Sequence, residues 1–159
     1  MDRALRRAAG LSLAWLASAA ALAQPVPAMQ TWHPWQLDSV LVVWALRQLP
    51  GPGLVFESVL RGTPIAAERA IDTPDSPYRR TGHRTAFEEA VRRNAISHPC
   101  VQRLRDAVRV VELAPWRKPE FPEVEAFEAR VLKVIPTQPT RDGLDAALAE
   151  VDRYCREQQ

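Results

Sequence analysis

Apolar residues recur at helical spacing in several stretches of this chain, and proline or a polar capping residue separates each stretch from the next. The first stretch spans residues 37–49 and is followed directly by Pro50-Gly51-Pro52-Gly53. A helix does not continue through such a sequence, because proline lacks the backbone N–H and glycine favours other conformations. The pattern therefore predicts separate helices that bury their apolar faces against one another.

Two further helices are predicted in the middle of the chain. Thr85 and Glu88 have the spacing of a capping box, and the apolar residues that follow begin an amphipathic helix. The next helix is expected to open at Ser97-His98-Pro99, with Pro99 in the first turn, where its missing N–H costs nothing. Its inner face carries Cys100 and apolar residues at helical spacing.

The last two helices follow Trp116. One has Val124, Phe127 and Val131 on its inner face and ends before Pro136. We expect Thr140 to cap the final helix, whose apolar face includes Cys155. The chain thus has about five predicted helices.

Strands are expected to be short and few. Leu54-Val55-Phe56 is an apolar run suited to a buried strand, and Ala70-Ile71 is a second candidate. The sequence predicts an α+β fold in which helices dominate, with one or two short strands. One domain is expected over residues 37–159, preceded at residues 24–36 by an extension that contains prolines and tryptophans.

The first 23 residues have the layout of a secretory signal peptide. Arg3, Arg6 and Arg7 precede an apolar run that closes with Ala21-Leu22-Ala23. Cleavage is expected after Ala23, with Ala28 as an alternative site. The run is shorter than the roughly 20 residues that span a bilayer, which disfavours an uncleaved anchor. We therefore expect the protein in the periplasm or secreted, with no membrane anchor after cleavage.

Charge gives no support for nucleic-acid binding. The chain has 21 basic and 19 acidic residues, and the excess belongs to the leader. Once residues 1–23 are removed with their three arginines and one aspartate, 18 basic residues face 18 acidic ones. A basic patch is the usual mark of a nucleic-acid-binding protein, so we expect none here.

Cys100 and Cys155 are the only cysteines. In an oxidising compartment two cysteines predict one disulfide, which would add about 4 kcal/mol of stability by the chain-entropy argument. Two separate buried thiols are the alternative. A metal pair is disfavoured, because neither cysteine has a second cysteine or a histidine at ligand spacing.

The sequence contains no motif that indicates a particular reaction or cofactor. The chain lacks G-x-S-x-G, H-E-x-x-H, a Walker loop and a dinucleotide fingerprint. The segment Tyr78-Arg79-Arg80-Thr81-Gly82-His83-Arg84 is basic and lies just before the capped helix at Thr85. A helix N-terminus beside arginines suits an oxyanion, although a solvated loop is the simpler interpretation. Asp38 is expected either to cap the first helix or to face a pocket, and Asp72 to lie in a turn.

Nine short segments occur in an order that is similar to the pattern of one protein family. They are Asp38-Ser39-Val40 with Trp44-Ala45-Leu46-Arg47-Gln48-Leu49, Leu54-Val55-Phe56, Ile71-Asp72-Thr73-Pro74, His83-Arg84-Thr85-Ala86-Phe87, His98-Pro99-Cys100-Val101 with Val110-Val111-Glu112-Leu113, Pro119-Glu120-Phe121-Pro122-Glu123-Val124, and Val151-Asp152-Arg153-Tyr154-Cys155-Arg156. In this order they resemble the C-terminal domain of the chromate resistance protein ChrB family, also described as chromate resistance exported proteins. The sequence departs from the family pattern at Ser39, Leu49, Ile71 and Glu123, which stand where the family has Arg, Phe, Phe and Gly.

The resemblance implies an exported protein that binds or senses an oxyanion or a divalent metal in stress protection. It also implies that Asp38, Asp72, His83 and Glu112 line one pocket, in which they bind a cation or orient Arg84 toward an anion. Two alternatives stay open. One is a periplasmic enzyme that uses His83 as general acid or base beside Asp38 or Glu112. The other is a helical module that binds a protein partner and no small ligand.

Overall fold

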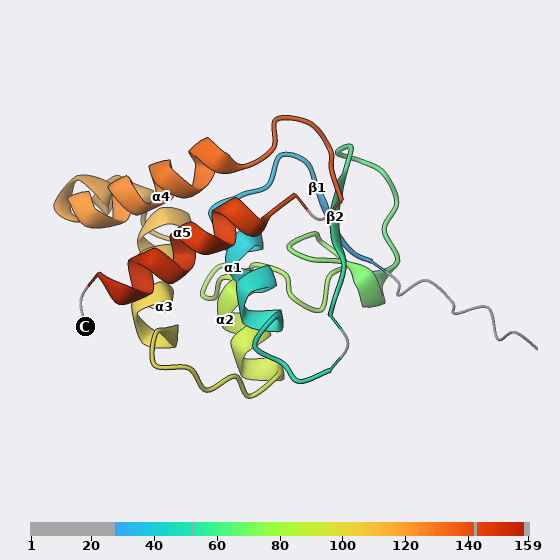
Figure 1. Ribbon diagram of the computed structural model, residues 1–159, viewed down its shortest axis with the longest axis horizontal. Coiled ribbons are helices and arrows are strands. Elements are labelled where there is room, and N and C mark those ends of the chain that lie inside the picture. Colours follow the sequence, from blue (N-terminus) through green and yellow to red (C-terminus); the bar gives the residue numbers. More distant parts are fainter. Residues whose placement is uncertain (1–27, 52, 142, 158–159) are drawn as a thin grey trace, which may run out of the picture.

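The computed structural model describes residues 28–51, 53–141 and 143–157, so the predicted signal peptide at residues 1–23 lies outside the described residues. The described chain forms a helix-dominated α+β fold, as predicted (Figure 1). None of its helices has both the length and the apolar character needed to cross a bilayer. In chain order the elements are β1 (Met29–Trp32), α1 (Leu37–Leu46), β2 (Phe56–Val59), the 3-10 helix η1 (Ala67–Arg69), α2 (Ala86–Arg93), α3 (Val101–Glu112), the 3-10 helix η2 (Pro115–Glu120), α4 (Pro122–Val134) and α5 (Asp145–Arg156).

Helix α1 lies at the centre of the fold. Every residue from Leu37 to Leu46 is buried, and the helix contacts α2, α3, α4 and α5 (Figure 1). Its sequence is apolar on all sides except at Asp38 and Ser39, which suits a helix surrounded by protein. Any polar side chain on α1 must therefore find its partner inside the molecule.

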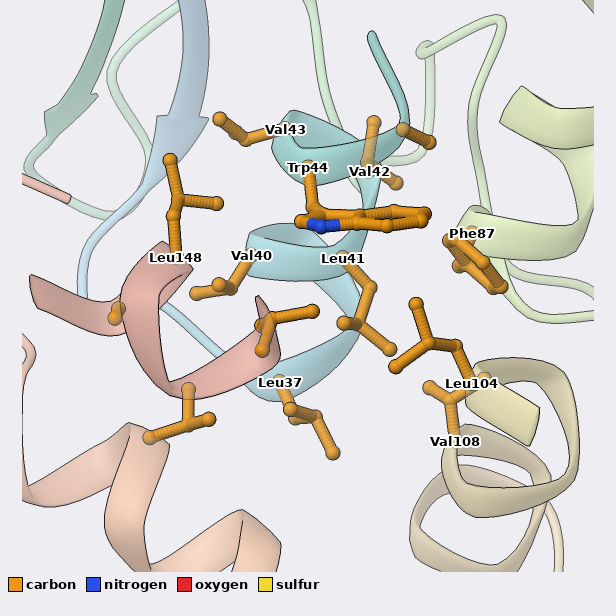
Figure 2. Packing of buried hydrophobic residues seen from close by; sticks show 14 of the residues in the cluster. Leu37, Val40, Leu41, Val42, Val43, Trp44, Phe87, Leu104, Val108 and Leu148 are labelled. Atoms are coloured by element: carbon orange, nitrogen blue, oxygen red, sulfur yellow. The ribbon is translucent and has the colours of Figure 1, made fainter. Parts of the chain in front are cut away.

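The side chains around α1 form one core. Trp44 lies at its middle, with Phe87 of α2 beside it at 6.4 Å between ring centroids (Figure 2). The indole N–H of Trp44 donates a 2.8 Å hydrogen bond to Asp152 of α5. The predicted pairing of Cys100 with Cys155 is confirmed: the two cysteines form a disulfide that joins the residue before α3 to α5, with Cα atoms 5.6 Å apart.

The sheet has two parallel strands connected through α1. Met29 pairs with Phe56 and Trp32 pairs with Val59. The strand predicted at residues 54–56 thus begins at Phe56 and continues to Val59. Its partner comes from the predicted extension, which is therefore part of the sheet.

The second predicted strand, Ala70-Ile71, was wrong. Ala70 and Ile71 form only isolated bridges, with Gln30 and Tyr78. The next residue, Asp72, has a φ of 47°, in the left-handed region, and this turn ends the extended conformation. Asp72 does lie at a turn, as predicted.

Helix boundaries differ from the predictions at two N-termini. The capping box of Thr85 and Glu88 is present at α2. In contrast, α3 begins at Val101, because residues 98–100 form a turn closed by a hydrogen bond from the Val101 N–H to the His98 carbonyl. Thr140 does not cap α5, which begins at Asp145; its carbonyl instead accepts a 2.8 Å hydrogen bond from Ser58 N–H of β2.

Candidate functional site

Asp38 lies in the first turn of α1 and caps a different helix. Its two carboxylate oxygens accept hydrogen bonds of 2.8 Å from the backbone N–H groups of Ala86 and Phe87, the first two residues of α2. The prediction that Asp38 caps its own helix was therefore wrong. The N-cap position of α1 is Gln36, which makes no side-chain cap. The Asp38 side chain is fully buried, and its partners are N–H groups at the start of α2 that have no acceptor within their own helix.

Arg80 joins three buried or nearly buried carboxylates. Its guanidinium lies 3.4 Å from Asp38 and 3.3 Å from Asp72, and it also pairs with Glu112 at the end of α3. Ser39 donates a 3.2 Å hydrogen bond to the same Asp72 oxygen that Arg80 contacts. The planar guanidinium presents several N–H donors in fixed directions, which allows one side chain to serve three carboxylates.

The structure brings together three of the five predicted ligand-binding residues: Asp38, Asp72 and Glu112. The other two lie elsewhere. His83 is exposed and borders a separate cavity of about 1110 Å³, and Arg84 pairs with Glu89 at 2.9 Å. Whether any of the five binds a ligand stays a prediction.

Arg80 is the residue that sequence reasoning did not single out, although it lies in the basic segment before Thr85. Three acidic residues at the ends of apolar elements need a buried cation, and this signal could have pointed to an arginine in that segment. Spacing alone did not distinguish Arg80 from Arg79 and Arg84.

The three carboxyl groups around Arg80 are harder to ionise than isolated ones. Burial, together with the charge of Asp72, raises the pKa of Asp38 to about 7, against the opposing hydrogen bonds from Phe87 and Ala86. Burial also raises the pKa of Asp72 and of Glu112, although Arg80 acts in the opposite direction on both. Burial disfavours the charged form, and each carboxylate also repels its neighbours.

Beside this cluster lies a cavity of about 640 Å³. Its walls are mostly apolar, with the carboxylates of Glu112 and Glu128 and the guanidinium of Arg80 as charged groups. It is lined by residues 33–37, which connect β1 to α1, by Arg80, by Val111 and Glu112 of α3, by Glu128 and Leu132 of α4, and by residues 135–137.

Unpartnered polar atoms gather in the lining of this cavity. In the described part of the chain, the buried side-chain nitrogen and oxygen atoms without a hydrogen-bond partner are His33 Nδ1, Trp35 Nε1 and Arg80 Nε. All three residues line the cavity. The Arg80 nitrogen keeps its ion-pair contact with Asp38, but its geometry is not that of a hydrogen bond. Trp35 is 2% exposed, so water does not reach its indole N–H from bulk solvent. Buried polar groups in proteins are normally hydrogen-bonded, so three such exceptions in one cavity lining are unusual.

The arrangement of the acidic cluster does not suit a metal ion. The Arg80 guanidinium lies among its carboxylates, in the position that a cation would need. Over the described ranges, no group of three or more His, Cys, Asp and Glu side chains has the arrangement to hold a metal ion.

Comparisons of the chain with protein-family models, with curated proteins and with solved structures gave no match.

Proposed function

We propose that this protein binds a small molecule in the 640 Å³ cavity between the β1–α1 connection and α4. The observation that carries the proposal is the placement of His33 Nδ1, Trp35 Nε1 and Arg80 Nε, which have no hydrogen-bond partner and all belong to the lining. A bound molecule would supply partners to His33 and Trp35, while Arg80 Nε keeps its ion-pair contact with Asp38. Without a ligand or water, each unsatisfied group costs about 1–3 kcal/mol.

The size and the composition of the cavity support this proposal. Sites for small molecules commonly have volumes of roughly 300–1,000 Å³, apolar walls and a few convergent polar groups. Here Leu37, Val111 and Leu132 supply apolar wall, and Trp35 and Arg80 supply donors.

The site is also held in place before any ligand arrives. Arg80 is fixed by three carboxylates from separate segments, and one of these, Asp38, belongs to the buried helix α1. Trp35 belongs to the core. A preformed site spends little binding free energy on ordering its own side chains.

We further propose that the binding protein is exported and acts in stress protection, on the basis of the leader sequence and the resemblance to the chromate-resistance family. We propose a binding role rather than an enzyme in which His83 is the catalytic residue. That side chain is exposed, and the backbone N–H of His83 donates a hydrogen bond to the hydroxyl of Thr81. His83 and Glu112 line different cavities.

Calorimetric titration tests the proposal. The purified protein is titrated with chromate, sulfate and divalent metal ions, which the resemblance suggests, and with pools of small organic fragments. Binding that is lost in Trp35→Phe and retained in Trp116→Phe supports the cavity, because Trp116 is 75% exposed and lies outside it. Circular dichroism checks that both variants fold. Binding that survives Trp35→Phe unchanged, or no binding at all, contradicts the proposal.

A further inference from the structure

The charges around the cavity indicate which class of molecule it takes. Resting on the proposed function, we infer that the ligand is a small organic cation: an ammonium or guanidinium group carried on an apolar body, with an acceptor atom for the indole N–H of Trp35. This departs from the oxyanion that the family resemblance suggests.

Carboxylates outnumber cations at this end of the molecule. Glu112 and Glu128 line the cavity, and Asp38 and Asp72 lie directly behind Arg80. The cations in contact with these four carboxylates in the described residues are Arg80 and Lys118. Four carboxyl groups therefore share two cations. A positively charged ligand removes this imbalance, whereas an oxyanion increases it.

Glu128 is the carboxylate best placed for such a ligand. It lies on α4 with a side chain that is 16% exposed, and its charge raises the pKa of Glu112 on α3. The two acids therefore act on one another. Glu112 pairs with Arg80 and Glu128 pairs with Lys118 at 2.5 Å, and the charge of Lys118 also opposes the rise in the pKa of Glu112. An ammonium group in the cavity would interact with both.

The other residues of the cavity lining indicate what else the ligand must contain. Leu37, Val111, Leu132 and Ile135 offer contact to an apolar body. Trp35 has only a donor to offer through its indole nitrogen, so the ligand needs an acceptor such as a hydroxyl, ether or carbonyl oxygen. A bare metal ion provides neither the apolar body nor the acceptor.

A set of probes that share one body and differ in charge tests this class. Phenethylamine, 2-phenylethanol and phenylacetate supply the cation, the neutral molecule and the anion, and an aliphatic set built on cyclohexane repeats the comparison. Chromate and zinc chloride are titrated in parallel. Dissociation constants are measured by calorimetry, and location in the cavity is read from the NMR signal of the Trp35 indole N–H. We expect the amines to bind the most tightly in both sets.

Variants that are expected to weaken or to tighten amine binding are titrated with the same probes. Glu128→Gln should weaken amine binding about tenfold, the factor expected for loss of one hydrogen bond to a charged group. Glu125→Gln removes the same charge from an exposed position on α4 and should change nothing. Lys118→Met frees Glu128 from its counterion and should tighten amine binding. General damage to the fold would not produce effects in both directions.

The possible failures are distinguishable. If neutral or anionic probes, or chromate or zinc, bind in the cavity as tightly as the amines, the ligand class is wrong and the proposed binding function stands. If no probe of any charge shifts the Trp35 signal, the inference fails together with the proposed function. Equal amine binding by Glu128→Gln and the unmodified protein also overturns the inference.

Discussion

Asp38 and Phe87 lie 49 residues apart in the sequence, yet a hydrogen bond of 2.8 Å joins the carboxylate of one to the backbone N–H of the other. The bond fixes the N-terminus of α2 to the side of α1, and a second bond from Ala86 reinforces it. Because the same carboxylate also contacts Arg80, one buried side chain contributes both to the packing of two helices and to the position of the cationic group in the cavity wall.

Asp38→Ala should destabilise the protein strongly. The change leaves two N–H groups of α2 without their cap and removes one carboxylate from Arg80. Breaking a buried charged network costs about 3–5 kcal/mol. Urea denaturation measures the loss. Asp145→Ala is the control, since Asp145 pairs with Arg47 while 79% exposed, and it should cost less than about 1 kcal/mol. Similar losses in the two variants would contradict the role given to Asp38.

Stability should fall as the pH rises toward and through neutrality. The pKa of Asp38 is about 7 in the folded protein and 3.8 in an unfolded chain, so the folded state binds the proton more tightly. The stability that this proton contributes is fully present below pH 3.8 and is lost as the pH rises through about 7. Asp72 and Glu112 shift in the same direction.

Denaturation between pH 5 and 8 measures this effect. Glu89 acts with the opposite sign, because its pKa is lowered from 4.5 to about 2 by Arg92, and its contribution is lost only as the pH falls below 4.5. It therefore does not interfere in the measured window. Asp38→Asn should flatten the pH dependence there. An equal slope in this variant and the unmodified protein would show that Asp38 is ionised throughout.

Arg80→Lys should cost about 2 kcal/mol, although it keeps the charge. A lysine ammonium cannot reproduce the fork of N–H donors with which Arg80 serves three carboxylates. Arg79→Lys is the matched control in the adjacent position, where the side chain bonds only the Pro74 carbonyl at 3.3 Å. Chemical denaturation of the two variants should separate them. Equal stability would mean that the three carboxylates need only a positive charge.

Reduction of the Cys100–Cys155 disulfide should lower the free energy of unfolding by about 4 kcal/mol, because the bond closes a long loop in the unfolded chain. The measurement is urea denaturation with and without reductant. The double variant Cys100→Ala/Cys155→Ala should match the reduced protein and should not respond to reductant. A response of that variant would indicate that reductant acts elsewhere.

Local signals in the sequence predicted the helices, because helices depend on nearby residues. The cysteine pair was predicted because the chain has only two cysteines. The capping box at Thr85 is a four-residue pattern and appears as predicted. Strand β1 was missed because it has only four residues, lies between Pro27 and Pro34, and pairs with a strand on the far side of α1 in the sequence.

The site was predicted only in part for the same reason. Asp38, Asp72 and Glu112 were expected to lie together, and they do. The sequence does not show that α2 approaches α1 at Asp38, and that approach decides which helix Asp38 caps. The sequence also does not show which arginine of the basic segment 78–84 points inward. Arg80 does so, whereas His83 stays exposed.

The central claim is that the cavity lined by Trp35 and Arg80 holds a small molecule, and the indole N–H of Trp35 reports on it directly. The measurement is the ¹⁵N–¹H spectrum of the tryptophan side chains during addition of the amine probes, with Trp35→Phe to assign the signal. The account predicts a saturable shift of the Trp35 signal while the exposed Trp116 signal stays in place. A Trp35 signal that does not move at any probe concentration would contradict it.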